Sequence, residues 1–179
     1  MVNEVKKPDA ADALEILRAD HRSVEKLFDA FRPAPDAAAD ARFALVKRAC
    51  EQLTVHAMLE EELLYPAASE ALPDATIKVD EALVEHYLVK SLIQRFVTLE
   101  PSHTGFDATF KVLSELVRHH VDEEEKTLFP ALRKSSLDLA ELGNRIAARK
   151  RQLEEKLDAA GVRSTGDRTF SLSHLDFPE

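Results

Sequence analysis

Apolar residues recur every three or four positions along most of the chain, which is the period of one face of an α-helix. Five such stretches are separated by segments that contain proline, glycine or short polar residues, where helices commonly begin and end. The chain is also rich in alanine and leucine and has only four glycines, a composition that favours helices over sheets. The pattern predicts an all-α protein. The predicted helices span residues 12–31, 36 or 40–67, 74–97, 104–131 and 137–159.

Local residues predict how several of these helices begin and which side they bury. Asp12-Ala-Leu-Glu15 is typical of a capping box, and Ser135 or Ser136 is expected to cap the fifth helix. Pro66 lacks an amide donor and should kink or end the second helix near that point. The predicted inward face of the third helix carries Val79, Leu83, His86, Lys90, Ile93 and Val97.

Four of the helices are long and are joined by short connections, which favours an up-down-up-down four-helix bundle. The fifth predicted helix carries its apolar residues among many charges, so we expect it to pack on the outside of the bundle. The resulting division is a polar N-terminal arm (1–11), the bundle (12–134), the fifth helix (135–161) and a C-terminal tail without periodicity (162–179).

A repeat connects the two halves of the predicted bundle. The segment HAMLEEELLYP at 56–66 has a copy, HVDEEEKTLFP, at 120–130, which is 64 residues later. In both copies a histidine precedes a glutamate by four residues, so the two side chains share one face of a helix. His21 and His86 repeat with an offset of 65. The repeat predicts a pseudo-two-fold axis between the first two helices and the next two.

Six polar residues fall at core positions of the four predicted helices. One such histidine alone is more often a hydrogen-bonded structural residue. Six buried together without partners would cost several kcal/mol for each charged group, more than a bundle of this size offsets. A bound cation removes that cost, so the sequence predicts a metal site. Its predicted ligands are His21, His56, Glu60, His86, His120 and Glu124.

The composition of this ligand set indicates the kind of metal. It contains no cysteine, which disfavours a structural thiolate zinc site, and its imidazoles disfavour Mg²⁺ and Ca²⁺. Two histidines and one carboxylate per half suggest two ions, each held by two histidines and bridged by both glutamates. With an oxo or hydroxo bridge each ion would be five-coordinate and keep one open position. Iron is the expected metal, ahead of manganese or zinc.

The doubled His-x-x-x-Glu with its aromatic-Pro pair, together with Asp20-His21 and Glu85-His86, resembles the hemerythrin-like HHE cation-binding domains. The resemblance covers about residues 12–134 and implies a non-haem di-iron centre held by the six residues above. Oxygen-carrying hemerythrins have a further histidine where this chain has Lys90. The likeness therefore moves towards the branch with four histidines and two glutamates, which includes proteins implicated in iron–sulfur cluster repair and in nitric oxide or peroxide chemistry.

Several other residues are candidates for neighbours of the metals. Glu25 and Lys90 occupy equivalent positions in the repeat, and we predict an ion pair between them just beyond the metals, with extension of both into solvent as the alternative. Tyr87, next to His86, is a third candidate. Tyr65 and Phe129 are expected to fill the core beneath the site, and Glu61 and Glu125 to be solvated charges rather than ligands.

Charge and composition exclude some classes of partner. The net charge of −9 argues against a nucleic-acid partner, and no apolar run is long enough to span a membrane. The single cysteine is compatible with a reducing cytoplasm, the expected location. The predicted function is binding or sensing of a small molecule such as O₂, NO or peroxide. The alternatives are a redox enzyme for peroxide disproportionation or NO reduction, or an iron donor in iron–sulfur cluster repair.

Overall fold

The computed structural model describes residues 11–31 and 39–159, and the regular elements among these residues are all helical. The predicted all-α class is therefore confirmed. Most of the predicted arm, the possible cap Asp36 and the tail 162–179 lie outside the described residues. The elements are α1 (Ala13–Ala30), α2 (Ala39–Leu59), η2 (Glu60–Leu64), α3 (Tyr65–Ala71), η3 (Pro73–Ala75), α4 (Thr76–Arg95), α5 (Gly105–Glu123), η4 (Glu124–Leu128), α6 (Phe129–Lys134) and α7 (Leu139–Ala159).

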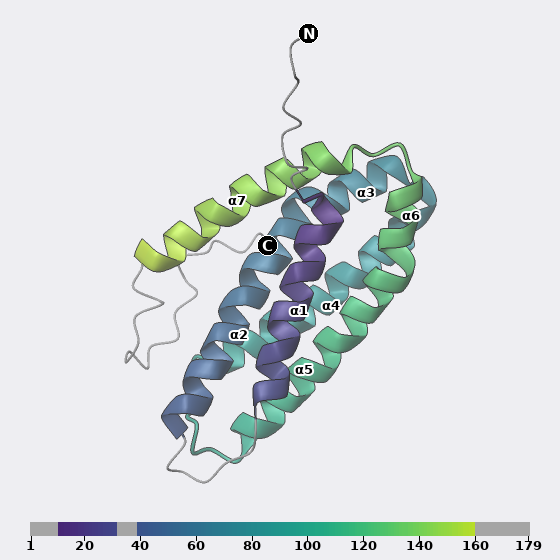
Figure 1. Cartoon of the computed structure of the whole chain (residues 1–179). Helices are drawn as coiled ribbons and strands as arrows, with labels where there is room; N and C mark the ends of the chain where they lie inside the picture. The colour runs from purple at the N-terminus through teal and green to yellow at the C-terminus, as the bar shows by residue number, and fades with distance from the viewer. Residues whose placement is uncertain (1–10, 32–38, 160–179) are drawn as a thin grey trace.

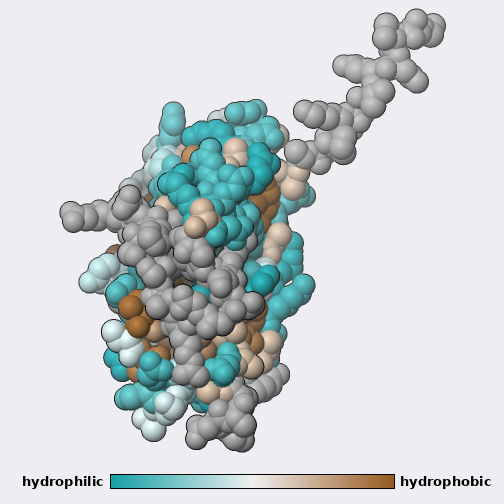
Figure 2. Space-filling model, turned by 90° about the vertical axis from the view of Figure 1, so that its left-hand side faces the viewer, coloured by the Kyte–Doolittle hydropathy of each residue, from teal (hydrophilic) through white to brown (hydrophobic). Residues whose placement is uncertain are grey.

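The four long helices α1, α2, α4 and α5 lie side by side and alternate in direction, as expected for the predicted bundle (Figure 1). Helix α7 crosses the outside of the bundle and packs on α1 and α2. It buries Leu142, Ile146, Leu153 and Leu157 and turns its charged residues outward. The upper part of the face seen in Figure 2 is accordingly hydrophilic. Among the described residues, no helix is long and apolar enough to cross a membrane.

The predicted start of α1 is confirmed. Asp12 accepts a hydrogen bond from the Glu15 amide, and the Glu15 side chain accepts one from the Asp12 amide, so two otherwise unpaired N–H groups are satisfied. The cap of α7 differs from the prediction: Asp138, rather than Ser135 or Ser136, accepts bonds from the amides of residues 140 and 141.

The predicted inward face of α4 is wrong by one residue at several positions. Leu83 and Val97 are each 41% exposed, whereas Ala82, Val89 and Phe96 are buried together with the correctly placed His86 and Ile93. The predicted face contains Leu83, Lys90 and Val97, whereas the residue before each of them is the buried one. Ala82 is buried because it lies one helical turn before His86 and therefore on the same face of α4.

The predicted disturbance near Pro66 takes the form of a π-helical turn, and the helix continues beyond it. In η2 the Tyr65 amide donates to the Glu60 carbonyl, and in η4 the Phe129 amide donates to the Glu124 carbonyl. A proline ring collides with the carbonyl four residues earlier in a regular α-helix, and the wider π turn before it relieves that collision. Both copies of the repeat thus widen at the glutamate of the His-x-x-x-Glu pair.

Gly143 permits the close packing of α7 on the start of α1. A Cβ atom at this position would lie 2.8 Å from the Ala13 amide nitrogen and 2.9 Å from the Ala11 carbonyl oxygen. We expect Gly143→Ala to lower the free energy of unfolding by about 1–3 kcal/mol, because backbone atoms cannot move aside as a side chain can. Chemical denaturation would measure the effect. Ala147→Gly, a substitution elsewhere in α7, is the control for helix propensity, and equal unfolding midpoints for Gly143→Ala and the wild type would contradict this packing.

Candidate metal centre

The six predicted ligands meet in the interior of the bundle, although they come from α1, α2, η2, α4, α5 and η4. Each is at most 6% exposed, and Glu60 is completely buried. The inward stripe of each helix brings one histidine to this level, and each His-x-x-x-Glu repeat adds a glutamate one turn further along. The structure therefore brings all six predicted side chains together: His21, His56, Glu60, His86, His120 and Glu124.

The histidines form two pairs with a glutamate between them. The Nε2 atoms of His21 and His56 are 3.1 Å apart, as are those of His86 and His120. Glu60 places Oε1 3.1 Å from His56 Nε2 and Oε2 3.3 Å from His86 Nε2, so one carboxylate touches both pairs.

Glu124 lies at the same level as Glu60. Its Oε2 is 3.5 Å from His21 Nε2 and 3.8 Å from His120 Nε2. The side chains thus form two compact groups, within which the potential ligand atoms lie within 4.8 Å of one another. The two groups share Glu60, and they are His21, His56, Glu60 and Glu124 in one and Glu60, His86 and His120 in the other.

A carboxylate faces the outer nitrogen of every histidine. His21 donates to Glu125 at 2.8 Å, His86 to Glu61 at 2.9 Å and His120 to Glu85 at 2.8 Å, while Asp20 lies 3.8 Å from His56 Nδ1. Carboxylates only accept, so the bonded Nδ1 atoms carry hydrogen, and the neutral form of each of these imidazoles has its lone pair on Nε2. This is how outer carboxylates orient imidazoles for a metal and raise their basicity.

Glu61 and Glu125 therefore differ from the prediction that they are solvated charges, because each accepts a hydrogen bond from a histidine of the cluster. The repeat in the sequence could have predicted these outer carboxylates, because they occur at matching positions in its two copies. Glu61 and Glu125 follow the repeated glutamates, and Asp20 and Glu85 precede the histidines of the first and third predicted helices.

A basic side chain lies beyond each of these outer carboxylates. Lys90 donates to both oxygens of Glu61 at 2.9 and 3.0 Å. The remaining pairs are Asp20 with Lys150 of α7, Glu125 with Arg18 at 3.6 Å, and Glu85 with His119 at 3.6 Å. Three of the outer carboxylates are thus paired with a lysine or an arginine nearer the surface, and the fourth lies beside His119.

The two predicted neighbours Glu25 and Lys90 do not pair with each other. Glu25 accepts from Arg118 at 2.9 Å, and Lys90 reaches Glu61 instead. The rotation of α1 turns Glu25 towards α5 and away from α4. Tyr87 also differs from the prediction, since it is 67% exposed on the outer side of α4 and does not lie against the buried histidines.

Tyr65 takes a role that the sequence analysis did not assign. Its hydroxyl donates to Glu124 Oε1 at 3.0 Å and lies 3.2 Å from His86 Nε2. Burial and the charges of Glu60 and Glu124 raise the pKa of Tyr65 well above its usual range. The aligned residue of the other repeat, Phe129, stacks on His21 with a centroid distance of 5.8 Å. The sequence signal that could have indicated this role is that Tyr65 has a hydroxyl and Phe129, at the same position of the other repeat, has none.

The chemistry of these donors fits a metal cation. The Nδ1 atoms of His86 and His120 both donate to carboxylates, so their Nε2 lone pairs face each other at 3.1 Å and repel unless a positive charge lies beside them. Neither oxygen of the buried Glu60 has a hydrogen-bond partner. Such a set of convergent nitrogen and oxygen atoms requires either protons or a metal ion.

Protons on the histidines are the alternative to a metal as the source of positive charge in the cluster. Burial would lower the pKa of His56, but the charge of Glu60 and the contact with Asp20 outweigh it and raise that pKa to about 10. The pKa of His120 is raised to about 10 against burial by Glu60 and Glu85. Burial alone would raise the pKa of Glu60, but its contacts with the histidines lower that pKa well below its usual range. A bound cation would replace these protons, as metal binding to histidine generally requires.

A helical bundle with two groups of histidine and glutamate around a shared carboxylate belongs to the class of cation-binding four-helix domains. Comparison with protein families identifies the particular one. The family model described as Hemerythrin HHE cation binding domain matches residues 12–132. The chain belongs to this family, as the resemblance of its motifs had indicated, and membership implies that it binds a metal cation.

Individual relatives agree with this assignment. The uncharacterized protein Rv2633c of Mycobacterium tuberculosis is 26% identical over 145 residues, which cover 79% of this chain and 87% of that protein. A crystal structure of its homologue from Mycobacterium kansasii, a hemerythrin HHE cation binding domain-containing protein, superimposes with a TM-score of 0.70 and 26% identity, covering 88% of this chain and 95% of that one. A protein named DNA nickase from a Nostoc species is 28% identical over 154 residues, but the match covers 85% of this chain and only 42% of that protein.

Proposed function

We propose that this chain is a non-haem di-iron protein that binds or senses a small molecule, with O₂, NO and peroxide as the candidates. Residues 12–134 would form the metal-binding bundle. Each pair of histidines would hold one ion, and Glu60 and Glu124 would bridge the two. The observation that carries this proposal is the completely buried Glu60 carboxylate, which contacts both histidine pairs and has no hydrogen-bond partner.

The protein side chains have separate tasks in this proposal. The outer carboxylates Glu61, Glu85 and Glu125 orient the imidazoles by hydrogen bonds and hold their Nε2 lone pairs inward. The apolar side chains around them exclude water and keep the electrostatic interactions of the cluster strong. Bound iron would supply redox chemistry and an open position for the exogenous molecule.

A small cavity beside the histidines supports a small, neutral ligand. It has a volume of about 20 Å³ and is lined by all four histidines and by apolar side chains that include Val24, Leu53, Val89 and Val117. That volume suits one molecule of the size of water or a diatomic gas. The apolar side chains of the lining favour O₂ or NO over a charged ligand.

Val89→Leu is expected to fill this cavity and to weaken binding of NO or O₂ by about tenfold or more, since one added methylene removes most of the free volume. The iron content should stay unchanged. Optical titration of the iron-loaded protein with NO would measure the change in Kd. Val79→Leu is the matched control, because Val79 is a buried valine of the same helix that does not line the cavity. Equal NO affinity of Val89→Leu and the wild type would show that the ligand binds elsewhere.

Tyr65 favours the enzyme alternative as the second candidate. Its hydroxyl contacts Glu124 inside the cluster and could exchange a proton with a reacting molecule there, which peroxide disproportionation or NO reduction requires. The proposed location is the reducing cytoplasm. No nucleic-acid partner is proposed, because the chain has a net charge of −9 and nucleic acids are also negatively charged.

The proposal is tested by metal analysis of the purified protein, followed by optical spectra after separate additions of O₂, peroxide and NO. Two irons per chain with a saturable spectral change would support a binder or sensor. Repeated consumption of peroxide or NO would favour the enzyme. A chain that takes up no iron, with an intact helical fold, would overturn the proposal.

A further inference from the structure

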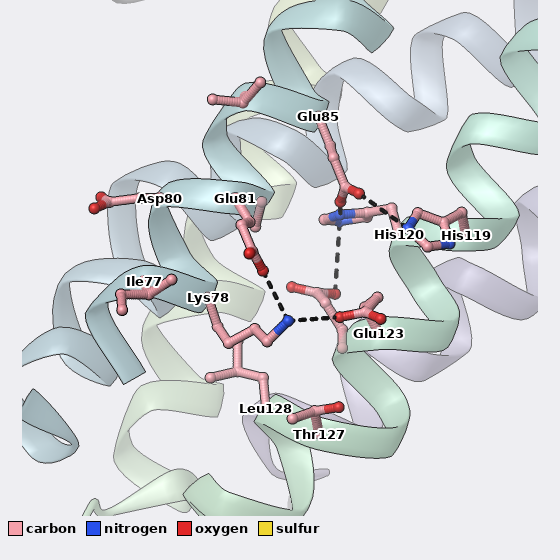
Figure 3. A pocket seen from close by; sticks show the side chains of 13 residues that line it. Ile77, Lys78, Asp80, Glu81, Glu85, His119, His120, Glu123, Thr127 and Leu128 are labelled. Carbon is pink, nitrogen blue, oxygen red and sulfur yellow. Dashed lines mark hydrogen bonds and ion pairs between the residues drawn. The ribbon is translucent and has the colours of Figure 1, made fainter. Parts of the chain in front are cut away.

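A wide groove opens on the surface between α4 and α5 and leads to the metal centre (Figure 3). Its volume is about 630 Å³, and its lining includes His120 and Glu124 of the cluster. Ile77, Val84 and Leu128 form apolar parts of its wall. Because the groove joins bulk solvent to two proposed ligands, it offers a route for a molecule or ion to reach the site.

The polar lining of the groove is strongly acidic. It contains one lysine, Lys78, and five carboxylates, which are Asp80, Glu81, Glu85, Glu123 and Glu124. A cleft of one charge sign with apolar walls concentrates counter-ions and accelerates their arrival. An anion or a neutral gas gains nothing from these carboxylates, whereas they attract a divalent cation.

The carboxylates that line the groove range from exposed to buried. The side chain of Glu81 is 56% exposed, that of Glu123 44%, that of Glu85 20% and that of Glu124 3%. The innermost oxygen, Glu124 Oε2, is buried and has no hydrogen-bond partner. A cation that moved from the exposed to the buried carboxylates would exchange water for carboxylate oxygen in steps and would finish at a proposed ligand of the centre.

Lys78 lies across the outer end of this series. Its Nζ donates to Glu81 at 2.7 Å and to Glu123 at 3.1 Å, and it thereby links α4 to α5 (Figure 3). The ammonium group occupies the position that an incoming cation would take between these two carboxylates. It therefore competes with the cation and also connects the two helices beside the groove.

The pseudo-symmetric surface of the other half is sealed. Lys78, His119 and Glu123 align with Ala13, Val55 and Leu59, which are all buried, and α7 packs on α1, α2 and η2 there. Among the described residues, the open side is thus the one that carries Lys78, His119 and Glu123, and the sealed side carries the apolar residues aligned with them. This difference between the halves indicates that the open groove serves the centre and is not a by-product of the repeat.

We infer that the groove between α4 and α5 is the route by which a hydrated divalent metal cation enters the centre, with Glu81 and Glu123 as the outer transit ligands and Lys78 as their competitor. The inference rests on the proposed metal-binding function. It adds a loading path and the residues that control its rate, which are separate from the ligands that hold the metal at equilibrium.

The test is the rate of Co²⁺ uptake by the full-length, metal-free chain, followed by stopped-flow absorbance at low ionic strength. Val84→Lys places a positive charge in the groove at an exposed position and should slow uptake about threefold or more. Lys78→Met should accelerate uptake by a similar factor of about three, because both outer carboxylates become free. The final amount of bound Co²⁺ should be the same in every variant.

Matched controls separate the groove from general charge effects. Val112→Lys makes the same change at an exposed valine of α5 that does not line the groove, and Lys111→Met removes an exposed lysine paired with Glu115. Both should load within experimental error of the wild type. Uptake by the two groove variants at the same rates as their controls, with full final occupancy, would overturn the route alone. No Co²⁺ bound by the wild type at equilibrium would overturn the proposed function and the route with it.

Discussion

Glu60→Ala is expected to abolish metal binding, so that a chain that purifies with two iron ions would purify with none. Glu60 is completely buried and is the residue shared by both groups of potential ligands. In the proposed centre its removal would take away the carboxylate that contacts both histidine pairs. Loss of an outer hydrogen-bond partner of a ligand already weakens metal binding about 10–100-fold, and loss of a shared ligand should exceed that range. Metal analysis after anaerobic purification would measure the change.

Glu62→Ala is the matched control for this substitution. Glu62 lies in the same π-helical turn but points outward, where it pairs with Arg149 of α7. Its replacement should leave the iron content unchanged. Two irons retained in Glu60→Ala would show that the centre is built on other residues, and loss of iron in both variants would indicate damage to η2 rather than loss of a ligand.

Removal of the metal is expected to lower the melting temperature by roughly 8–16 °C. A cation present at about a thousand times its Kd stabilises the folded state by about 4 kcal/mol, and about 1 kcal/mol corresponds to about 2–4 °C for a chain of this size. The physical source is the burial of six polar side chains whose charges must be compensated. Thermal unfolding of chelator-treated and iron-reloaded protein, followed by circular dichroism, would measure the shift.

The Glu60→Ala variant provides the control for this second prediction, because iron should not change its melting temperature. Identical melting of the metal-free and the reloaded wild type, with iron shown to be bound, would contradict the prediction. The cluster would then be stabilised equally well by its own protons. That outcome would leave the ligands in place and would remove only the coupling between metal binding and folding.

The sequence alone determined the helical class, the bundle and the six residues that the structure brings together. Helical periodicity is a local property, because it depends on which residues share a face along 15 or 20 positions. The spacing of four residues between His56 and Glu60, and again between His120 and Glu124, fixes which way both side chains point. The repeat then related one half of the bundle to the other without knowledge of how the helices pack.

Contacts between helices could not be obtained in this way. Whether Lys90 meets Glu25 or Glu61 depends on the rotation and the axial position of α4 relative to its neighbours, and periodicity within one helix leaves both undetermined. The same reason explains why Leu83 and Val97 were predicted to face inward where Ala82 and Phe96 are buried.

Only the tertiary structure decided how the two halves differ. It brought Glu85 of α4 to His120 of α5, Tyr65 to Glu124, and α7 onto α1, α2 and η2 of the first half. Each of these contacts joins residues that are distant in the chain, and each depends on side chains that meet only when the helices pack. The repeat in the sequence therefore predicts a symmetric centre, while packing gives that centre a sealed side and an open one.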